Sequence, residues 1–549
     1  MLFFGRKRSP APRLGTSRRA LLRNGGLLSI VGAAPAFPHN TTEQSARHTK
    51  TGEIYEAVGV HPLINARGTF TIITGSQTLP EVKRAMDEAS RSYVQMDELM
   101  RGVGTRLAEL TESEWGIVTA GCCAALTHCT AACVAGTNPE RMQRLPDLTG
   151  LKSEVIIPEY SRNVYDHAIR MVGVKIVEVR NPSELASAFT EQTGMVYILA
   201  GPGDEGPLGT KAVSEVARRH GVPVIVDAAA EILTIPNVHL QRGASAVAYS
   251  GGKCIRGPQA AGLLLGEKSL LQAAWANSAP HHAFGRSLKV GKEEIMGMLA
   301  AVEMWTKRDH AAEWRRWQEW LEEISAGVRR VAGVSARMDE GEQGLSNRSP
   351  RLSITWDAAQ LGITGQELSK ILLDTEPRIV LGSAQGSRPE EMASAISITP
   401  YMMMPGEAKI VAERIYALLS KPPRIPAPEQ LPVGEPAAIA GQWNVRIDFE
   451  RGSAKHVLIL EQNGTALEGT HQGEFVSGDL RGAVAANFVR FRSSQKIQGT
   501  RLSYDFSGTV EGDRMSGTVD LGEYGAARWS AERHRYEMPN GVIRPVKPA

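Results

Sequence analysis

The first part of the chain alternates between short apolar runs and amphipathic stretches. Between about residues 53 and 310, runs typical of buried strands are separated by segments with apolar positions at helical spacing, as at Ala124–Ala135 and Lys211–His220. This alternation predicts an α/β domain built on a parallel sheet. The clearest predicted strands are Gly116–Thr119, Val155–Ile157, Val174–Val179, Met195–Ala200, Val222–Asp227, Ala246–Tyr249 and Gly262–Leu265.

A long helical stretch rich in Trp, Arg and Glu follows, at about Glu293–Val331. It leads into a second α/β segment that ends near Leu419. We therefore expect a large domain over residues 53–310 and a smaller lobe over residues 311–420.

The pattern changes again after a Pro-rich stretch, which predicts a stiff linker over residues 421–436. From Ala438 to about His534, apolar and polar positions alternate with a period of two, and turn signals such as Asn463-Gly464 and Gly512-Asp513 recur. This pattern predicts an antiparallel β-barrel or sandwich over residues 437–537.

Residues 1–36 carry seven basic side chains and no acidic one. Arg18 and Arg19 precede an apolar run from Gly25 to Ala34, and Ala34-Pro35-Ala36 resembles a cleavage site. The stretch predicts a twin-arginine-type signal peptide, with residues 37–52 as a linker, and hence export to the periplasm. The alternative is an unprocessed basic tail on a cytoplasmic protein.

The rest of the chain is slightly acidic. Of 62 Lys and Arg, 55 lie beyond residue 36, against 59 Asp and Glu, so the net charge of this part is −4. Such a chain has no overall attraction for nucleic acid, and we expect no nucleic-acid partner. No internal segment is apolar for long enough to span a bilayer.

Five cysteines are present, and Cys122, Cys123, Cys129 and Cys133 are crowded into twelve residues. An odd number with this spacing does not indicate a disulfide framework. A metal site made by Cys129, Cys133 and His128 is the alternative to a packing face of small residues on a helix. We favour the packing face and expect no metal.

The strongest chemical signal is Ser250-Gly251-Gly252-Lys253, which directly follows a predicted strand. A lysine on a glycine-flanked turn suits pyridoxal 5′-phosphate (PLP), because its amine must reach the cofactor and swing away during catalysis. A solvated loop lysine or a phosphate-binding lysine fits the same motif when it is taken alone.

Two further features stand before Lys253 in the chain. Together they give the order of phosphate turn, aspartate and lysine that PLP enzymes of fold type I use. Asp227 ends an apolar strand 26 residues before Lys253, where a buried carboxylate would keep the pyridine nitrogen of PLP protonated. The stretch Thr119–Ala124 turns from a strand into a helix through Gly121, and a helix N-terminus with small residues binds phosphate. An ordinary strand-end aspartate and an ordinary helix start are the alternatives for each feature by itself.

Four stretches of the sequence form a more specific pattern: Ile64–Thr69, Asp227–Ala229, Ser250–Lys253 with Gly257-Pro258-Gln259, and Gly285-Arg286 with Lys289–Glu293. Through them, roughly residues 53–420 resemble the bacterial selenocysteine synthase-like family. That family includes L-seryl-tRNA(Sec) selenium transferases and D-glucosaminate-6-phosphate ammonia-lyases.

The resemblance implies an aspartate aminotransferase-like fold of type I, with Lys253 as the Schiff-base lysine and Asp227 as the partner of the ring nitrogen. It further implies phosphate contacts from Gly121, Cys122, Cys123 and Ser250, with another from Lys289. A ring that stacks on the cofactor would come from His167 or Tyr165, although a plain helix surface is the alternative. Enzymes of this class share sites between subunits, so a homodimer or higher assembly is implied.

The sequence departs from the selenium transferases at Arg67 and Arg256, and no tRNA-binding domain precedes residue 53. With Asn65, these arginines would bind a carboxylate or phosphate of a small substrate. We therefore expect a lyase that performs α,β-elimination on a small hydroxylated or phosphorylated amino acid through an aldimine on Lys253. The alternatives are a selenocysteine synthase-like transferase and an inactive exported protein that binds a ligand through its C-terminal domain.

Overall fold

The computed structural model describes residues 53–341, 344–388, 391–425 and 432–535. The predicted signal peptide, the linker over residues 37–52 and the centre of the Pro-rich linker lie outside these residues. The chain divides into two units, residues 1–62 and 63–549. The described part of the first contains the short helix α1 (Glu53–Glu56).

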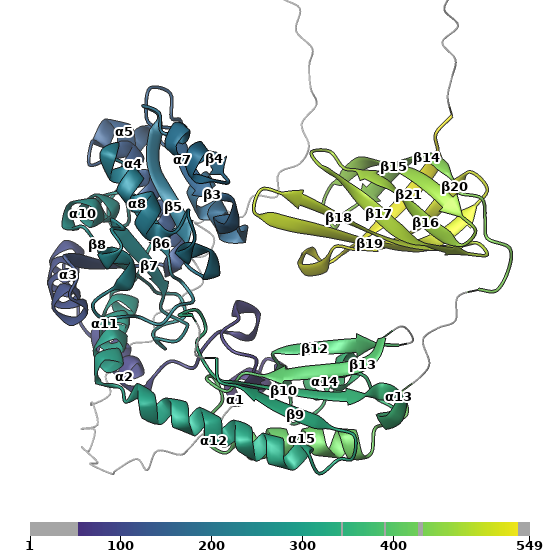
Figure 1. Cartoon of the computed structure of the whole chain (residues 1–549). Helices are drawn as coiled ribbons and strands as arrows, with labels where there is room; N and C mark the ends of the chain where they lie inside the picture. The colour runs from purple at the N-terminus through teal and green to yellow at the C-terminus, as the bar shows by residue number, and fades with distance from the viewer. Residues whose placement is uncertain (1–52, 342–343, 389–390, 426–431, 536–549) are drawn as a thin grey trace, which may run out of the picture. The chain divides into compact units, whose positions relative to one another are not determined.

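A seven-stranded sheet forms the centre of the large domain, with strand order β2-β8-β7-β6-β5-β3-β4 (Figure 1). Neighbouring strands are parallel except that β8 runs antiparallel to both β7 and β2. The parallel sheet expected from the sequence thus has one exception, β8, because the connection over residues 251–261 returns the chain antiparallel beside β7. The strands are β2 (Trp115–Thr119), β3 (Glu154–Pro158), β4 (Lys175–Val179), β5 (Thr193–Leu199), β6 (Val224–Asp227), β7 (Ala246–Ser250) and β8 (Gly262–Gly266).

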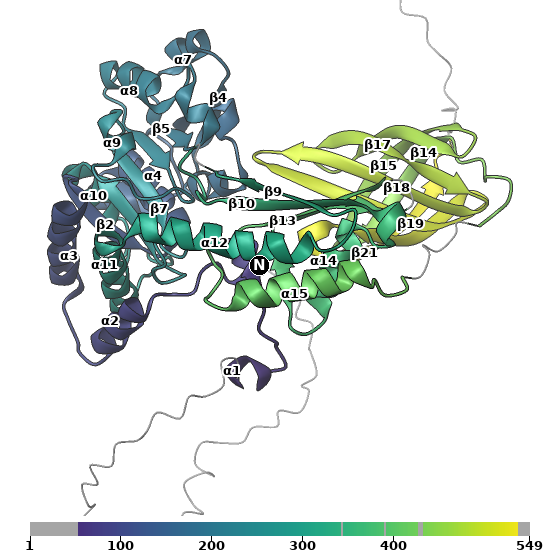
Figure 2. The ribbon, with the colours of Figure 1, turned by 60° about the horizontal axis from the view of Figure 1, so that its bottom comes forward.

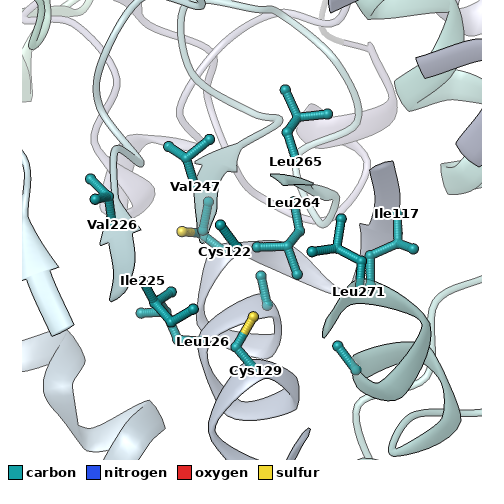
Figure 3. Close-up of a cluster of buried hydrophobic side chains, with 14 of the residues drawn as sticks. Ile117, Cys122, Leu126, Cys129, Ile225, Val226, Val247, Leu264, Leu265 and Leu271 are labelled. Carbon is teal, nitrogen blue, oxygen red and sulfur yellow. The ribbon is translucent and has the colours of Figure 1, made fainter. Parts of the chain in front are cut away.

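Helix α4 (Gly121–Ala135) is buried along almost its whole length and packs against β7 and β8. Figure 3 shows the Cys122 and Cys129 sulfur atoms among aliphatic side chains such as Leu126 and Leu264. Cys129 is thus a core residue, and the described residues contain no cluster of three or more metal-binding side chains. The other helices of this domain are α2 (Pro80–Ser90), α3 (Met96–Thr111), α5 (Pro139–Arg144), α6 (His167–Arg170), α7 (Pro182–Ala188), α8 (Thr210–Arg219), α9 (Val238–Gln241), α10 (Lys268–Ala276) and α11 (Lys292–Lys307).

The helical stretch expected at about Glu293–Val331 is two helices, α11 and α12 (His310–Val328). Asp309 separates them: its side chain accepts a hydrogen bond from the Ala312 backbone N–H at 2.9 Å and so begins α12 as an N-cap. Helix α12 then lies along α15 (Glu407–Ser420), as both ribbon views show (Figures 1 and 2).

The small lobe has its own hydrophobic core around a four-stranded antiparallel sheet in the order β12-β13-β10-β9. The strand β1 (Ile64–Ala66) pairs in parallel with β11 (Ile379–Leu381), and Ile64 is part of this core. The remaining elements are β9 (Ser335–Asp339), β10 (Arg351–Asp357), β12 (Ser383–Ser387), β13 (Glu391–Ile398), α13 (Ala358–Leu361) and α14 (Gly365–Asp374).

The C-terminal domain is a closed antiparallel barrel of eight consecutive strands, which confirms the barrel of the two predicted architectures. Its interior is packed with aromatic side chains, including Trp443, Phe491, Phe506 and Trp529. The strands are β14 (Gly441–Asp448), β15 (Ser453–Asn463), β16 (Ala466–Gln472), β17 (Ser477–Ala485), β18 (Phe488–Ile497), β19 (Thr500–Glu511), β20 (Arg514–Asp520) and β21 (Ala526–Arg533). Over the described residues, no helix is long and apolar enough to cross a membrane.

Candidate active site

Lys253 lies on a tight turn at the carboxyl end of β7. The turn is closed by hydrogen bonds from the Gly251 N–H to the Ala261 carbonyl and from the Gly257 N–H to the Gly251 carbonyl, both 2.8 Å. A Cβ on Gly252 would come 2.3 Å from the Gln259 Oε1 atom, and one on Gly251 would come 2.8 Å from the Ala261 carbonyl oxygen. The two glycines before the lysine are therefore required by close packing, which holds the base of the Lys253 side chain in place.

Asp227 is the last residue of β6, the strand that pairs with β7. Its carboxylate is buried and accepts hydrogen bonds from the Tyr197 hydroxyl at 3.0 Å and the Ala229 N–H at 3.0 Å. Burial raises its pKa, while these donors, the nearby Lys253 ammonium and the Cys122 thiol oppose the rise. Asp227 is thus a buried carboxylate that hydrogen bonds orient close to Lys253, as the sequence predicts.

Asn163 extends this arrangement, because its Nδ2 donates to the Tyr197 hydroxyl oxygen at 2.9 Å. The Tyr197 hydroxyl can then donate its single proton to Asp227. Neither Tyr197 nor Asn163 is predicted from the sequence. The only local signal was a tyrosine inside an otherwise aliphatic strand, and its partner Asp227 is known only once β5 and β6 are paired.

The start of α4 faces the same groups. Gly121 has a φ of +84°, a conformation that glycine adopts without strain, and Ala120 before it provides no side-chain cap. The first N–H groups of the helix therefore lack a side-chain acceptor. The Cys122 thiol lies 3.5 Å from Asp227 Oδ1, and burial raises its pKa, so it is a neutral donor. The predicted phosphate turn and the predicted lysine and aspartate thus lie together.

Of the two candidates for a stacking ring, Tyr165 lies within electrostatic reach of Asp227, and its side chain is 53% exposed. Burial raises the pKa of Tyr165, and nearby charge at Cys123 and Asp227 adds to the shift. His167 begins α6 with an exposed side chain, and no described contact joins it to Asp227 or Cys123. A stacking ring from His167 or Tyr165 therefore stays a prediction.

Asn65 and Arg67 belong to a turn that precedes the large domain. The Asn65 amide is used within the turn: its oxygen accepts from the N–H groups of Arg67 and Gly68, and its nitrogen donates to the Gly68 and Gly75 carbonyls. The Asn65 amide therefore shapes the backbone of this turn, and its predicted contact with substrate stays a prediction. The Arg67 guanidinium stacks over Phe70 at 4.1 Å, and its buried Nε has no partner among the described residues.

Of three other predicted site residues, one adjoins the turn of Lys253 and two have their described contacts elsewhere. Ser250 ends β7 directly before the lysine turn. Arg256 donates through its Nε to the Gln77 carbonyl at 3.0 Å and lines a separate cavity, so it is not placed as a substrate ligand. Lys289 is exposed before α11, where it helps to lower the pKa of Glu293, and no described contact joins it to Ser250.

A buried ionic cluster behind the lysine turn is also absent from the sequence predictions. His239 Nε2 lies 2.6 Å from Glu231 Oε2, and its Nδ1 lies 3.3 Å from Asp204 Oδ2. Burial opposes a charged imidazole, but the two carboxylates outweigh it and raise the pKa of His239 to about 9. The Glu231 carbonyl accepts a hydrogen bond from the Cys254 thiol at 3.1 Å, which connects the cluster to the residue after Lys253.

This fold has a lysine and an aspartate at the carboxyl ends of the adjacent strands β7 and β6, with the N-terminus of α4 close to the aspartate, and it defines a PLP enzyme of fold type I. No family model matches the chain. Among curated proteins, a 5'-C-glycyluridine monooxygenase-decarboxylase from Streptomyces sp. is 32% identical over 362 residues, 63% of this chain and 87% of that protein. A D-glucosaminate-6-phosphate ammonia lyase from Salmonella typhimurium is 28% identical over 377 residues, 66% of this chain and 97% of that one.

The solved structure of a D-glucosaminate-6-phosphate ammonia-lyase aligns with a TM-score of 0.59 and 26% identity, covering 67% of this chain and 98% of the other. The chain belongs to the selenocysteine synthase-like family of fold-type-I PLP enzymes.

Proposed function

We propose that this chain is a PLP-dependent lyase that acts on a small hydroxylated amino acid with a second anionic group, and that Lys253 is its cofactor lysine. The observation that carries the proposal is the pairing of β6 and β7, which sets Asp227 beside the glycine-held turn of Lys253. The Salmonella and Streptomyces relatives support an amino-acid substrate through the reactions in their names.

The residues present fit PLP. Burial raises the pKa of the Asp227 carboxylate, so a cationic partner would stabilise its ionised form. The protonated ring nitrogen of PLP would be such a partner. The uncapped start of α4 suits the phosphate group, because its free N–H groups and the helix dipole favour an anion. When bound, PLP supplies an electron sink for negative charge that develops at the substrate Cα.

Each residue then has a defined task. The Lys253 amine removes the proton from the substrate Cα as a general base. Asp227 holds the proton on the ring nitrogen, and Tyr197 with Asn163 fixes the orientation of that carboxylate. Arg67, with its unpartnered Nε, binds the second anionic group of the substrate.

The reaction class is tested by ammonia release from PLP-loaded protein. D-glucosaminate 6-phosphate, the same acid without phosphate, and serine form a graded panel. Loss of water from the substrate, followed by uptake of water and release of ammonia, yields a 2-oxo acid, and both products are measured. We expect release from the phosphorylated acid and none from Lys253→Ala protein.

Parallel reactions in air and under nitrogen separate elimination, which needs no oxygen, from an oxygenase reaction of the kind named for the Streptomyces relative. Addition of a thiol nucleophile tests for transfer, since a transferase would form a new C–S bond instead of releasing ammonia. Absence of ammonia and of oxo acid with every amino acid of the panel would contradict the lyase proposal.

The substrate role of Arg67 is tested by Arg67→Gln, with Arg91→Gln as a matched control at the exposed C-cap of α2. A charge-assisted hydrogen bond contributes roughly 1.5–3 kcal/mol, so we expect KM for the phosphorylated substrate to rise about tenfold or more with little change in kcat. An unchanged KM, or an equal rise with Arg91→Gln, would remove Arg67 from the site.

A further inference from the structure

A cavity lies beside the lysine turn. It has a volume of about 1060 Å³, just above the range of roughly 300–1,000 Å³ that small-molecule sites occupy. Cys254 and Arg256 line it, whereas Lys253, Asp227 and Cys122 do not. The cavity therefore adjoins the proposed active site but is not part of it.

One wall of this cavity is aromatic. Trp314 and Trp317 of α12 have ring centroids 6.0 Å apart, and Trp317 also contacts the Tyr401 ring edge to face, at 6.2 Å. Trp305 and Trp320, with the side chains of Met402, Met403 and Met404, continue the wall. Such a surface favours an apolar, polarisable body.

The rim of the cavity is positively charged. Arg256, Arg308, Arg316 and Arg348 line it, and Glu313 is the single acidic residue among the described lining residues. Arg308 lies 3.9 Å from Glu313, and its guanidinium stacks on Trp305 at 5.1 Å. Burial, together with the like charge of Arg308, lowers the pKa of Arg256. Partly buried positive charges repel one another beside an apolar wall, and a bound anion would stabilise their charged form.

We propose that this cavity binds an amphipathic organic anion, with its apolar body against the tryptophans and its head group at the arginines. This binding site is additional to the proposed lyase reaction. Arg308 donates to the carbonyls of Cys254 and Ile255 at 3.1 and 3.0 Å, and Tyr401 bonds to the Thr69 N–H at 3.0 Å. An occupant therefore contacts residues that hold both the lysine turn and the turn of Arg67.

The test uses the full chain loaded with PLP and two probes that share one ring system. Anilinonaphthalene sulfonate carries an anionic head, and N-phenylnaphthylamine is its neutral counterpart. Energy transfer from the cavity tryptophans to the bound probe is measured in titrations. We expect the sulfonate to bind at least about tenfold more tightly than the neutral amine, since a charge-assisted contact is worth that factor.

The site is located with the double variant Arg316→Gln/Arg348→Gln, which changes two exposed rim residues. Arg315→Gln is the matched control, since Arg315 is the next residue on α12 and does not line the cavity. We expect the double variant to weaken sulfonate binding at least about tenfold and the control to leave it unchanged.

Three results would overturn the proposal. The first is equal affinity for the neutral and the anionic probe, and the second is equal weakening by Arg315→Gln. The third is a dimer in sedimentation that excludes the sulfonate and dissociates in the double variant, because the cavity would then be covered by a second copy of the chain. Circular dichroism of each variant verifies that the comparison is between folded proteins.

Discussion

Asp227 is oriented by contacts from three different parts of the chain. Tyr197 reaches it from β5, the Ala229 N–H from the following loop and the Cys122 thiol from α4. Each contact favours the ionised carboxylate against the cost of burial, which is the largest influence on its pKa. The charge on this one residue therefore depends on donors that are distant in the sequence.

Tyr197→Phe removes one of these donors and keeps the ring. The Tyr197 hydroxyl lowers the pKa of Asp227, so its loss raises that pKa and moves the acid limb of the pH–activity profile to higher pH. We expect kcat at neutral pH to fall about tenfold, in line with a hydrogen bond to a charged group. Tyr249→Phe is the control, because that buried hydroxyl bonds to Asn237 instead. A profile that moves equally in both variants would contradict the assignment.

At the level of elements, the sequence was sufficient to predict those features that depend only on neighbouring residues in the chain. The strand ends at Asp227 and Ser250 and the glycine at the start of α4 follow from apolar runs that stop at polar or glycine residues. The direction of β8 and the break between α11 and α12 did not follow, because the first depends on pairing and the second on one capping aspartate. The cluster of His239, Glu231 and Asp204 could not be predicted from the sequence, because these three side chains come together only in the folded chain.

This cluster predicts a loss of stability in alkaline solution. The pKa of His239 is raised from 6.5 to about 9, so the stabilisation is complete below about pH 6.5 and is lost as pH rises through 9. The free energy of unfolding should therefore fall by on the order of 3 kcal/mol over this range, at 1.36 kcal/mol for each pKa unit. Urea unfolding between pH 6 and 10 measures it.

His239→Gln should lower the free energy of unfolding at pH 6.5 and flatten its decline above pH 8. Arg242 pairs with Asp204 on the other side of the cluster, and the substitution leaves this residue in place. An equally steep decline in His239→Gln protein would show that another group is responsible.

The whole molecule combines three hydrophobic cores: the large domain, the small lobe and the barrel. The sequence indicated these parts through changes of period, from mixed helix and strand to strict alternation. It gave no sign that β1, which precedes the large domain, would pair with β11 of the small lobe, since such pairing depends on contacts far apart in the chain. Arg67 directly follows β1, so this pairing also positions a proposed substrate ligand.

We also propose that the chain is exported, on the basis of Arg18, Arg19 and the apolar run that follows. Replacement of both arginines by lysine should stop export and retain the protein in the cytoplasm, because a twin-arginine signal is read by a receptor and not by charge alone. Fractionation of cells with an antibody against the barrel measures this. Arg6→Lys/Arg8→Lys is the control, and equal distribution of all variants would contradict export by this route.

The most direct test of the central claim is reduction of PLP-loaded protein with borohydride, followed by peptide mapping. We expect an absorbance band of bound PLP that reduction removes, with the label on the peptide that contains Lys253. Lys253→Ala protein should take no label, whereas Lys289→Ala protein should still be labelled at Lys253. Label on another lysine, or none in the wild-type protein, would show that Lys253 is not the cofactor lysine.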